Sequence, residues 1–283
     1  MTVESFLLEA RRAFHRALLD NGVLRVTAEG VPSNADSGSP SSIAMATKIL
    51  KEIGESAIGT KLAGQIAGAS FERVCEEFVR LTFCSLPQVR PGNWTVGRKG
   101  KIFQFDQYSH LDELEDLAEA SPELRTALGS DYLIKPDVVV ARAPEPDSSF
   151  NSDRKYLDSE VATLSPLRAV NNSTPILHAS ISCKWTLRSD RAQNARTEGL
   201  VLVKNRKGRL PHIVVVTGEP TPGRISSIAF GTGEVDCVYH FALPELVKAV
   251  KDLGYDDSQT TLNTMIKGKR LRDIADLPID LAI

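Results

Sequence analysis

Aromatic side chains and long apolar runs are scarce in this sequence of 283 residues. Aromatic residues make up 6% of the chain, and no stretch approaches about 18 uninterrupted apolar residues, so we expect no membrane-spanning helix and no membrane partner. The N-terminal segment carries Glu4 and Glu9 and has no apolar stretch that ends at a small-residue cleavage site. It therefore lacks the pattern of a secretory signal.

Cysteine pairs of metal-binding spacing are also absent. The four cysteines occur singly, without a CxxC pair or a His/Cys cluster of zinc-finger spacing; they are Cys75, Cys84, Cys183 and Cys237. This usage is typical of reduced packing residues, and it predicts a cytoplasmic protein without a structural zinc site.

Neither sign of charge is in clear excess. The 34 basic and 36 acidic residues give a net charge of -2, which argues against binding nucleic acid by overall positive charge. A local basic cleft is still compatible with this balance. From Lys184 to Arg209 eight basic residues stand against two acidic ones, a net charge of +6, and such a stripe suits contacts with phosphates.

The first 90 residues have mostly helical patterning. Residues 3–19 are amphipathic, and the polar residues 30–42 predict a loop. Ser41 or Ser42 is expected to cap a helix that runs to about residue 55, and a further helix is expected over about 59–83.

From Trp94 onward, strand and helix patterns alternate. Short strands are expected at 94–97, 101–108, 134–141, 176–185, 212–218, 224–230 and 235–241, and helices at 111–120, 189–204 and 244–253. This alternation predicts an α/β fold, with a mixed central β-sheet flanked by helices. We expect one domain over 1–283, in which 1–90 is the helical N-terminal part and 91–283 the α/β core.

Residues 143–175 form a long connection between two of the expected core strands. The segment holds four prolines and many Ser, Asn and Asp residues. It is far longer than an ordinary connector, so it is a functional loop, an assembly surface or a disordered segment. We favour an assembly surface.

Three residues in the expected core have the chemistry of metal-assisted phosphodiester hydrolysis. Asp137 begins one strand, Lys184 ends a second, and Glu198 lies on the helix that follows. Singly they have ordinary explanations, namely a turn, a solvated strand edge and an exposed helical face. Together, the carboxylates can hold Mg²⁺ through hard oxygen ligands, and the lysine can position the attacking water.

The same residues carry a family resemblance. A Pro-Asp followed by xxK on paired strands is the pattern of the PD-(D/E)xK nuclease superfamily, whose usual acid two residues before the lysine is here Ser182. The run from Lys184 to Glu198, KWTLRSDRAQNARTE, closely resembles the active-site and recognition segment of NgoMIV-type type II restriction endonucleases. In that family an SxK tripeptide replaces the usual motif and the acid is moved to the next helix. The resemblance is strongest over 135–140 and 180–199 and looser over 57–80.

The resemblance implies a restriction-endonuclease-like core with an active site in this region. Asp137 and Glu198 would be the metal ligands, Lys184 the catalytic lysine, and Ser182 would line the site. The implied cofactor is Mg²⁺, with two ions in each active site.

The resemblance also implies a glutamate from an N-terminal helix and a glutamine that helps to select the outer base pair. Glu72 is the best match for the glutamate, with Glu76 and Glu77 as alternatives one turn later. Gln65, seven residues before Glu72, fits the glutamine. The ordinary explanation for Gln65 is a polar residue on a helix surface. The ordinary explanation for each glutamate is an exposed acidic residue of a helix.

The start of the helix that bears Glu198 has the side chains that recognise C·G pairs. Arg188 and Arg191 can pair bidentately with guanine, and Asp190 can accept from the amino group of cytosine. Arg191 lies seven residues before Glu198, two helical turns or about 10 Å away on one face. The alternative is a capped, charge-paired turn with Ser189 as the cap; the nearby Lys184 and Glu198 favour recognition.

These expectations combine into one function. We expect a Mg²⁺-dependent type II restriction endonuclease that cleaves double-stranded DNA, and the resemblance implies a palindromic site with a CCGG core, specifically GCCGGC, cut to leave 5′ overhangs. A palindrome requires a homodimer, and the resemblance implies a homotetramer with the 143–175 loop as a contact. The alternatives are a non-specific or repair-type nuclease on the same core and a DNA-binding protein without catalysis.

Overall fold

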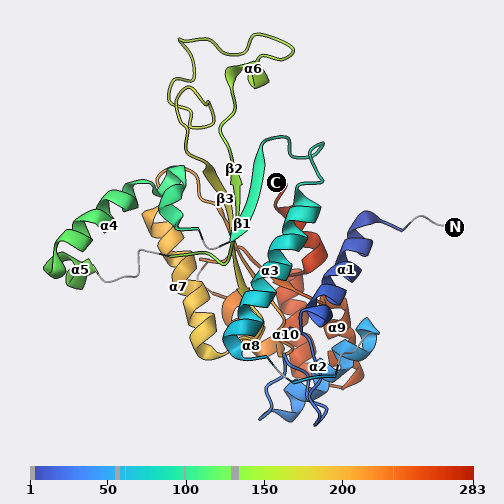
Figure 1. Cartoon of the computed structure of the whole chain (residues 1–283). Helices are drawn as coiled ribbons and strands as arrows, with labels where there is room; N and C mark the ends of the chain where they lie inside the picture. The colour runs from blue at the N-terminus through green and yellow to red at the C-terminus, as the bar shows by residue number, and fades with distance from the viewer. Residues whose placement is uncertain (1–3, 55–57, 61, 99, 129–133, 232) are drawn as a thin grey trace.

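The fold is built on one mixed β-sheet. The computed structural model describes residues 4–54, 58–60, 62–98, 100–128, 134–231 and 233–283. In this part of the chain, six strands lie in the order β1 to β6 (Figure 1). Their bounds are β1 Trp94–Arg98, β2 Val138–Arg142, β3 Ile176–Lys184, β4 His212–Thr217, β5 Cys237–His240 and β6 Leu271–Asp273. The pairs β1–β2 and β2–β3 are antiparallel, and β3 to β6 run parallel.

Helices surround the sheet, and the regular elements of the N-terminal part are the helices α1, α2 and α3 (Figure 1). They are α1 Phe6–Asp20, α2 Pro40–Ile53, α3 Gly64–Phe83, α4 His110–Ala120, α5 Pro122–Leu128, α6 Asp147–Phe150, α7 Ser189–Asn205, α8 Pro222–Ala229, α9 Leu243–Asp252, α10 Asp256–Lys267 and α11 Leu277–Asp280, with 3-10 turns η1 Ile102–Gln104, η2 Asp106–Tyr108 and η3 Ile274–Asp276. None of the helices in the described ranges is long and apolar enough to cross a bilayer. The predicted mixed sheet with flanking helices and a helical N-terminal part is confirmed.

Two predicted strands are wrong. Residues 224–230 lie mostly in helix α8, where Ile225, Ile228 and Ala229 are all buried at a helical spacing and Pro222 occupies the start of the helix. Residues 101–108 form the turns η1 and η2 instead of a strand.

The turns η1 and η2 and the start of α2 each follow from local spacing and capping. Ile102, Phe105 and Tyr108 recur every third residue, which suits 3-10 turns, and all three are buried. Helix α2 starts slightly before the predicted cap because the Ser39 hydroxyl accepts a hydrogen bond from the Ser42 N–H at 3.3 Å and Pro40 takes the first helical position.

Strand β2 is covered on both faces because its side chains alternate. Val138 and Val140 pack into the larger core cluster, which includes Phe71 of α3. Val139 and Ala141 point to a second cluster formed with the η1 and η2 turns and with α7. Both faces are therefore apolar, as in a central strand.

The 143–175 loop projects beyond one end of the sheet (Figure 1). It is folded around Arg168, which is 3% exposed. The guanidinium forms an ion pair with Asp147 at 2.6 Å and donates to the Asp158 carbonyl oxygen at 2.8 Å. Four large apolar side chains of the loop are nevertheless exposed: Tyr156, Val161, Leu164 and Val170.

Two buried histidines make the stability of the fold depend on pH. Burial lowers the pKa of His178 and that of His240 to about 4, from 6.5. His240 is held neutral, because its Nδ1 accepts from the Ala242 N–H at 3.1 Å while its Nε2 lies 3.1 Å from the Glu219 carbonyl oxygen, to which it can donate. Between pH 6.5 and about 4, the unfolded chain therefore binds protons that the folded chain does not.

We expect the contribution of these imidazoles to stability to be complete above pH 6.5 and to be lost as the pH falls toward 4. Within this range, each unit of decrease in pH lowers the free energy of unfolding by about 1.4 kcal/mol per histidine. Urea unfolding of the wild type and of His240→Gln at a series of pH values measures it. The difference in free energy of unfolding between the two proteins should shrink with acidification; a constant difference would contradict the expectation.

Candidate active site

Asp137 is bound to the end of β3. It immediately precedes β2, whose Val138 lies opposite Ile181 of the antiparallel β3, so Asp137 faces the last residues of that strand. One carboxylate oxygen, Oδ2, accepts from the Cys183 N–H at 2.7 Å and from the Lys184 Nζ at 2.9 Å. A hydrogen bond from a backbone N–H and an ion pair with a side chain thus hold the same carboxylate in place.

Glu198 reaches the same place from α7. Its Oε2 accepts a hydrogen bond from the Ser182 hydroxyl at 2.9 Å, and its Oε1 lies 3.8 Å from the Lys184 Nζ. Helix α7 returns along the sheet after β3, which brings a residue fourteen positions after Lys184 back beside it. The structure therefore brings together Asp137, Ser182, Lys184 and Glu198.

The charges in this group are strongly coupled. Burial raises the pKa of Glu198 above its usual range, and the Lys184 ammonium opposes that effect. Burial alone would lower the pKa of Lys184, but Glu198 and Asp137 outweigh it and raise that pKa. Lys184 is thus a stable cation between two carboxylates.

A cavity of about 720 Å³ adjoins this group and collects five of the predicted residues. Its lining includes Gln65, Glu72, Lys184, Arg188 and Arg191. Helix α3, which carries Gln65 and Glu72, is therefore placed against the end of β3.

Of the three glutamates considered on α3, Glu72 is the one in the lining of the cavity. Phe71, next to it, packs against Trp185 with ring centroids 5.0 Å apart. Glu76 pairs with Arg98 at 2.7 Å, and Glu77 is exposed.

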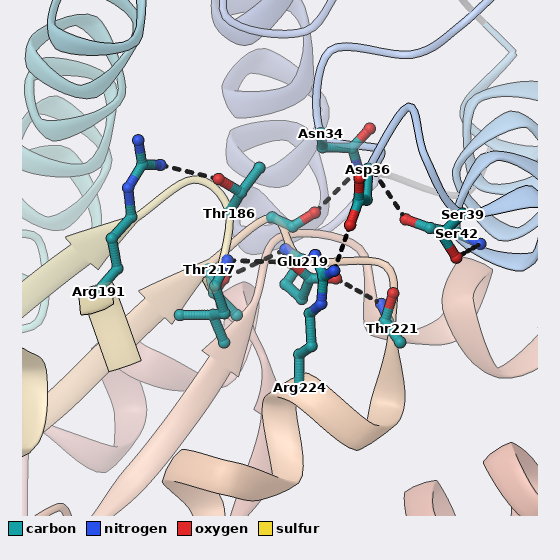
Figure 2. A network of polar contacts seen from close by, with 12 residues as sticks. Asn34, Asp36, Ser39, Ser42, Thr186, Arg191, Thr217, Glu219, Thr221 and Arg224 are labelled. Carbon is teal, nitrogen blue, oxygen red and sulfur yellow. Dashed lines mark hydrogen bonds and ion pairs between the residues drawn. The ribbon is translucent and has the colours of Figure 1, made fainter. Parts of the chain in front are cut away.

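The predicted recognition residues lie at the N-terminus of α7. Arg188 is the N-cap residue of the helix and makes no side-chain capping hydrogen bond, so the N-cap position is not that of Ser189, which is the first helical residue. Arg188 and Asp190 are exposed, and Arg191 donates from Nη1 to the Thr186 hydroxyl at 2.8 Å (Figure 2). The polar side chains at this end of α7 are therefore available at the cavity and its rim.

The basic residues of the stripe predicted over 184–209 are spread along α7, so they do not all lie at the cavity. Only Lys184, Arg188 and Arg191 of the eight basic residues line the cavity. Arg196 instead donates to Glu234. The remaining basic residues follow near or beyond the end of a helix of 17 residues, about 25 Å from its start.

The donor set is compatible with a hard divalent cation. In the described ranges, no group of three or more His, Cys, Asp or Glu side chains has a metal-holding arrangement. Asp137 and Glu198 are both held close to Lys184 and supply carboxylate oxygens. Two carboxylates suit Mg²⁺, which keeps several waters and commonly takes further oxygens from a substrate phosphate.

Sequence reasoning missed the residues that support this group from β4. Thr217, Gly218 and Glu219 follow one another at the end of that strand and contact the segment after Lys184. The TGE triplet after an apolar strand is a visible polar signal. Its partners depend on the β3–β4 register, which places Lys184 beside Thr217.

Comparisons with known proteins find relatives that match almost the whole chain. The NgoMIV restriction enzyme family matches residues 14–283. The chain is 51% identical over 280 residues to "Type II restriction enzyme NgoMIV" of Neisseria gonorrhoeae, which covers 97% of this chain and 98% of that protein. A crystal structure of the type IIF restriction endonuclease Bse634I with cognate DNA aligns with a TM-score of 0.39 and 14% identity, over 89% of this chain and 92% of that one.

Proposed function

This chain belongs to the NgoMIV restriction enzyme family and is a type II site-specific deoxyribonuclease, and we propose that it requires Mg²⁺ and cleaves GCCGGC to leave 5′ overhangs. The observation that carries the proposal is the contact of Asp137, Lys184 and Glu198 beside the cavity that Arg188 and Arg191 line. Lys184 and Glu198 thus share the 184–198 stretch of chain with Arg188 and Arg191, and Asp137 joins them from the start of β2.

We propose that Asp137 and Glu198 hold Mg²⁺, two ions in each active site, with Glu72 assisting from α3. When bound, the cation stabilises the attacking and leaving oxygens of the phosphodiester. Ser182 orients Glu198 through its hydroxyl, and the Cys183 N–H orients Asp137. The protein therefore fixes both carboxylates before DNA arrives.

Lys184 is proposed as the catalytic lysine. Its ammonium lies 2.9 Å from Asp137 and 3.8 Å from Glu198, so it can also contact a water or a phosphate oxygen that enters between them. A fixed cation there stabilises negative charge that develops on the phosphate.

Arg188, Asp190 and Arg191 are proposed to recognise the CCGG core. Their two guanidinium groups and one carboxylate supply the donors and the acceptor that guanine and cytosine require in the major groove. Gln65 lines the same cavity from α3 and is proposed to help select the outer G·C pair.

We expect Arg191→Ala to reduce discrimination by about 1–3 kcal/mol for one lost bidentate contact with guanine. The measurement compares Ca²⁺-supported binding to GCCGGC with binding to a site changed at one core position. Arg206→Ala, an exposed arginine beyond the other end of α7, is the control and should leave the ratio unchanged. Equal weakening on every sequence would make Arg191 a phosphate contact instead.

The protein is proposed to act as a homodimer on its palindrome and to assemble further into a homotetramer in the bacterial cytoplasm. The projecting 143–175 loop is the proposed contact, which its exposed apolar side chains support. Leu164, at 93% exposed, is the most prominent of them.

We expect Leu164→Glu to lower the mass of the assembly in light scattering, because a charge would replace an apolar side chain at the contact. Leu117→Glu is the matched control, since Leu117 is 60% exposed on α4, outside the loop. An unchanged mass for the Leu164 variant would remove this part of the loop from the assembly contact.

A further inference from the structure

Thr217 at the end of β4 and the two residues after it hold the segment that connects Lys184 to Arg188. The Thr217 hydroxyl donates to the Lys184 carbonyl oxygen at 2.7 Å, and the Gly218 N–H donates to the Trp185 carbonyl oxygen at 3.1 Å. The Glu219 carboxylate accepts from the Leu187 N–H at 2.9 Å. The 217–219 segment thus contacts the 184–187 segment at nearly every residue.

Glu219 is an unusual residue for this position because it is fully buried. Its exposure is 0%, and burial raises its pKa above the usual range of a glutamate. A buried carboxylate is unfavourable unless several partners compensate it. Here Oε2 accepts from the Leu187 N–H, Oε1 accepts from the Thr221 N–H at 3.1 Å, and Arg224 of α8 lies 3.8 Å from Oε2.

Gly218 allows the two segments to approach each other. A Cβ at this position would lie 2.3 Å from the Trp185 ring, which is far inside contact distance. That ring cannot move aside easily, because it packs against Phe71 and Phe241 with centroids 5.0 and 5.2 Å away.

The Leu187 amide lies between the proposed catalytic lysine and the start of the proposed recognition helix α7. It lies one residue before Arg188, the N-cap residue of α7, and three residues after Lys184. Fixing this amide fixes the direction in which the chain enters α7. This direction determines where the proposed recognition side chains Arg188 and Arg191 lie relative to Lys184.

We propose that Glu219 is a positioning residue that sets the recognition end of α7 relative to Lys184 through the Leu187 amide. This role rests on the proposed function of α7. Thr217 holds the catalytic end of the same segment through the Lys184 carbonyl. Glu219 therefore governs sequence discrimination, whereas Thr217 governs the cleavage rate.

The test is Glu219→Gln. The amide has the same size but only one acceptor oxygen, so its NH₂ group faces either the Leu187 or the Thr221 N–H. We expect the ratio of kcat/KM for GCCGGC to that for a site with one changed core base to fall about 10-fold or more, because displacements near 1 Å have effects of this size. Hydrogen exchange at the Leu187 amide should become faster.

Two further variants separate positioning from general destabilisation. Gln107→Glu is the reverse change at the other end of β3. Gln107 is 2% exposed and exchanges two hydrogen bonds with the Leu177 backbone. This variant should be less stable but keep the wild-type ratio of kcat/KM for the two sites. Thr217→Val should lower cleavage of both sites equally. Glu219→Met, an apolar side chain of similar length, repeats the test if the glutamine variant does not fold.

Retention of wild-type discrimination by the Glu219 variants, or an equal fall in the rates on both sites, would overturn the role of Glu219. A wild-type protein that cleaves without sequence preference would instead overturn the proposed function of α7. The two failures are therefore distinct.

Discussion

Lys184→Met is expected to reduce DNA cleavage by about 10²–10³-fold while leaving specific binding intact. Methionine keeps the apolar stem and removes the ammonium that lies between Asp137 and Glu198. Two effects add: negative charge on the phosphate loses a fixed cation, and the two carboxylates lose the charge that separates them. Binding energy from base and phosphate contacts does not depend on this group.

Single-turnover cleavage with Mg²⁺ and gel-shift binding with Ca²⁺ measure the two quantities separately. Lys248→Met is the control, because Lys248 is an exposed lysine that also pairs with a glutamate, Glu52, but lies outside the cavity. Cleavage by the Lys184 variant at the rate of the control would show that another residue performs its role.

Asp137→Asn has the second large expected effect. The amide can still accept the Cys183 N–H, so the strand pairing should survive, but it no longer carries the negative charge that holds a divalent cation. We expect cleavage to fall by about 10²-fold or more and the apparent Mg²⁺ requirement to rise. Titration of the cleavage rate with Mg²⁺ measures both.

Asp236→Asn is the matched control for this substitution. The Asp236 carboxylate also accepts a strand amide, from Ile213 at 2.8 Å, but at the opposite end of β4 from the cavity. If both variants lose activity to the same extent, the loss reflects the sheet and not the site.

The grouping of Asp137, Lys184 and Glu198 could be predicted because it depends on short stretches of chain. Asp137 and Lys184 stand at the ends of two apolar runs that pair with each other, and Glu198 lies on the helix directly after the second run. Strand ends and helical periodicity are visible in a sequence. The placement of Gln65 and Glu72 rests on the family resemblance, since nothing local indicates that α3 packs beside β3.

The contacts of Glu219 could not be predicted, because they depend on the register of two parallel strands separated by a helix. The register that places Lys184 beside Thr217 is decided by packing over the whole sheet. The strand predicted at 224–230 is wrong for a different reason. A short apolar pattern fits both a strand and a helix, and in the structure Ile225 and Ile228 are buried on one side of a helix.

The most direct test of the account is digestion of a plasmid of known sequence by the purified protein with Mg²⁺, followed by sequencing of the fragment ends. The account predicts discrete double-strand cuts at GCCGGC, with 5′ overhangs and no products when EDTA removes the metal. Fragments with ends unrelated to CCGG, or cleavage that persists in EDTA, would contradict it.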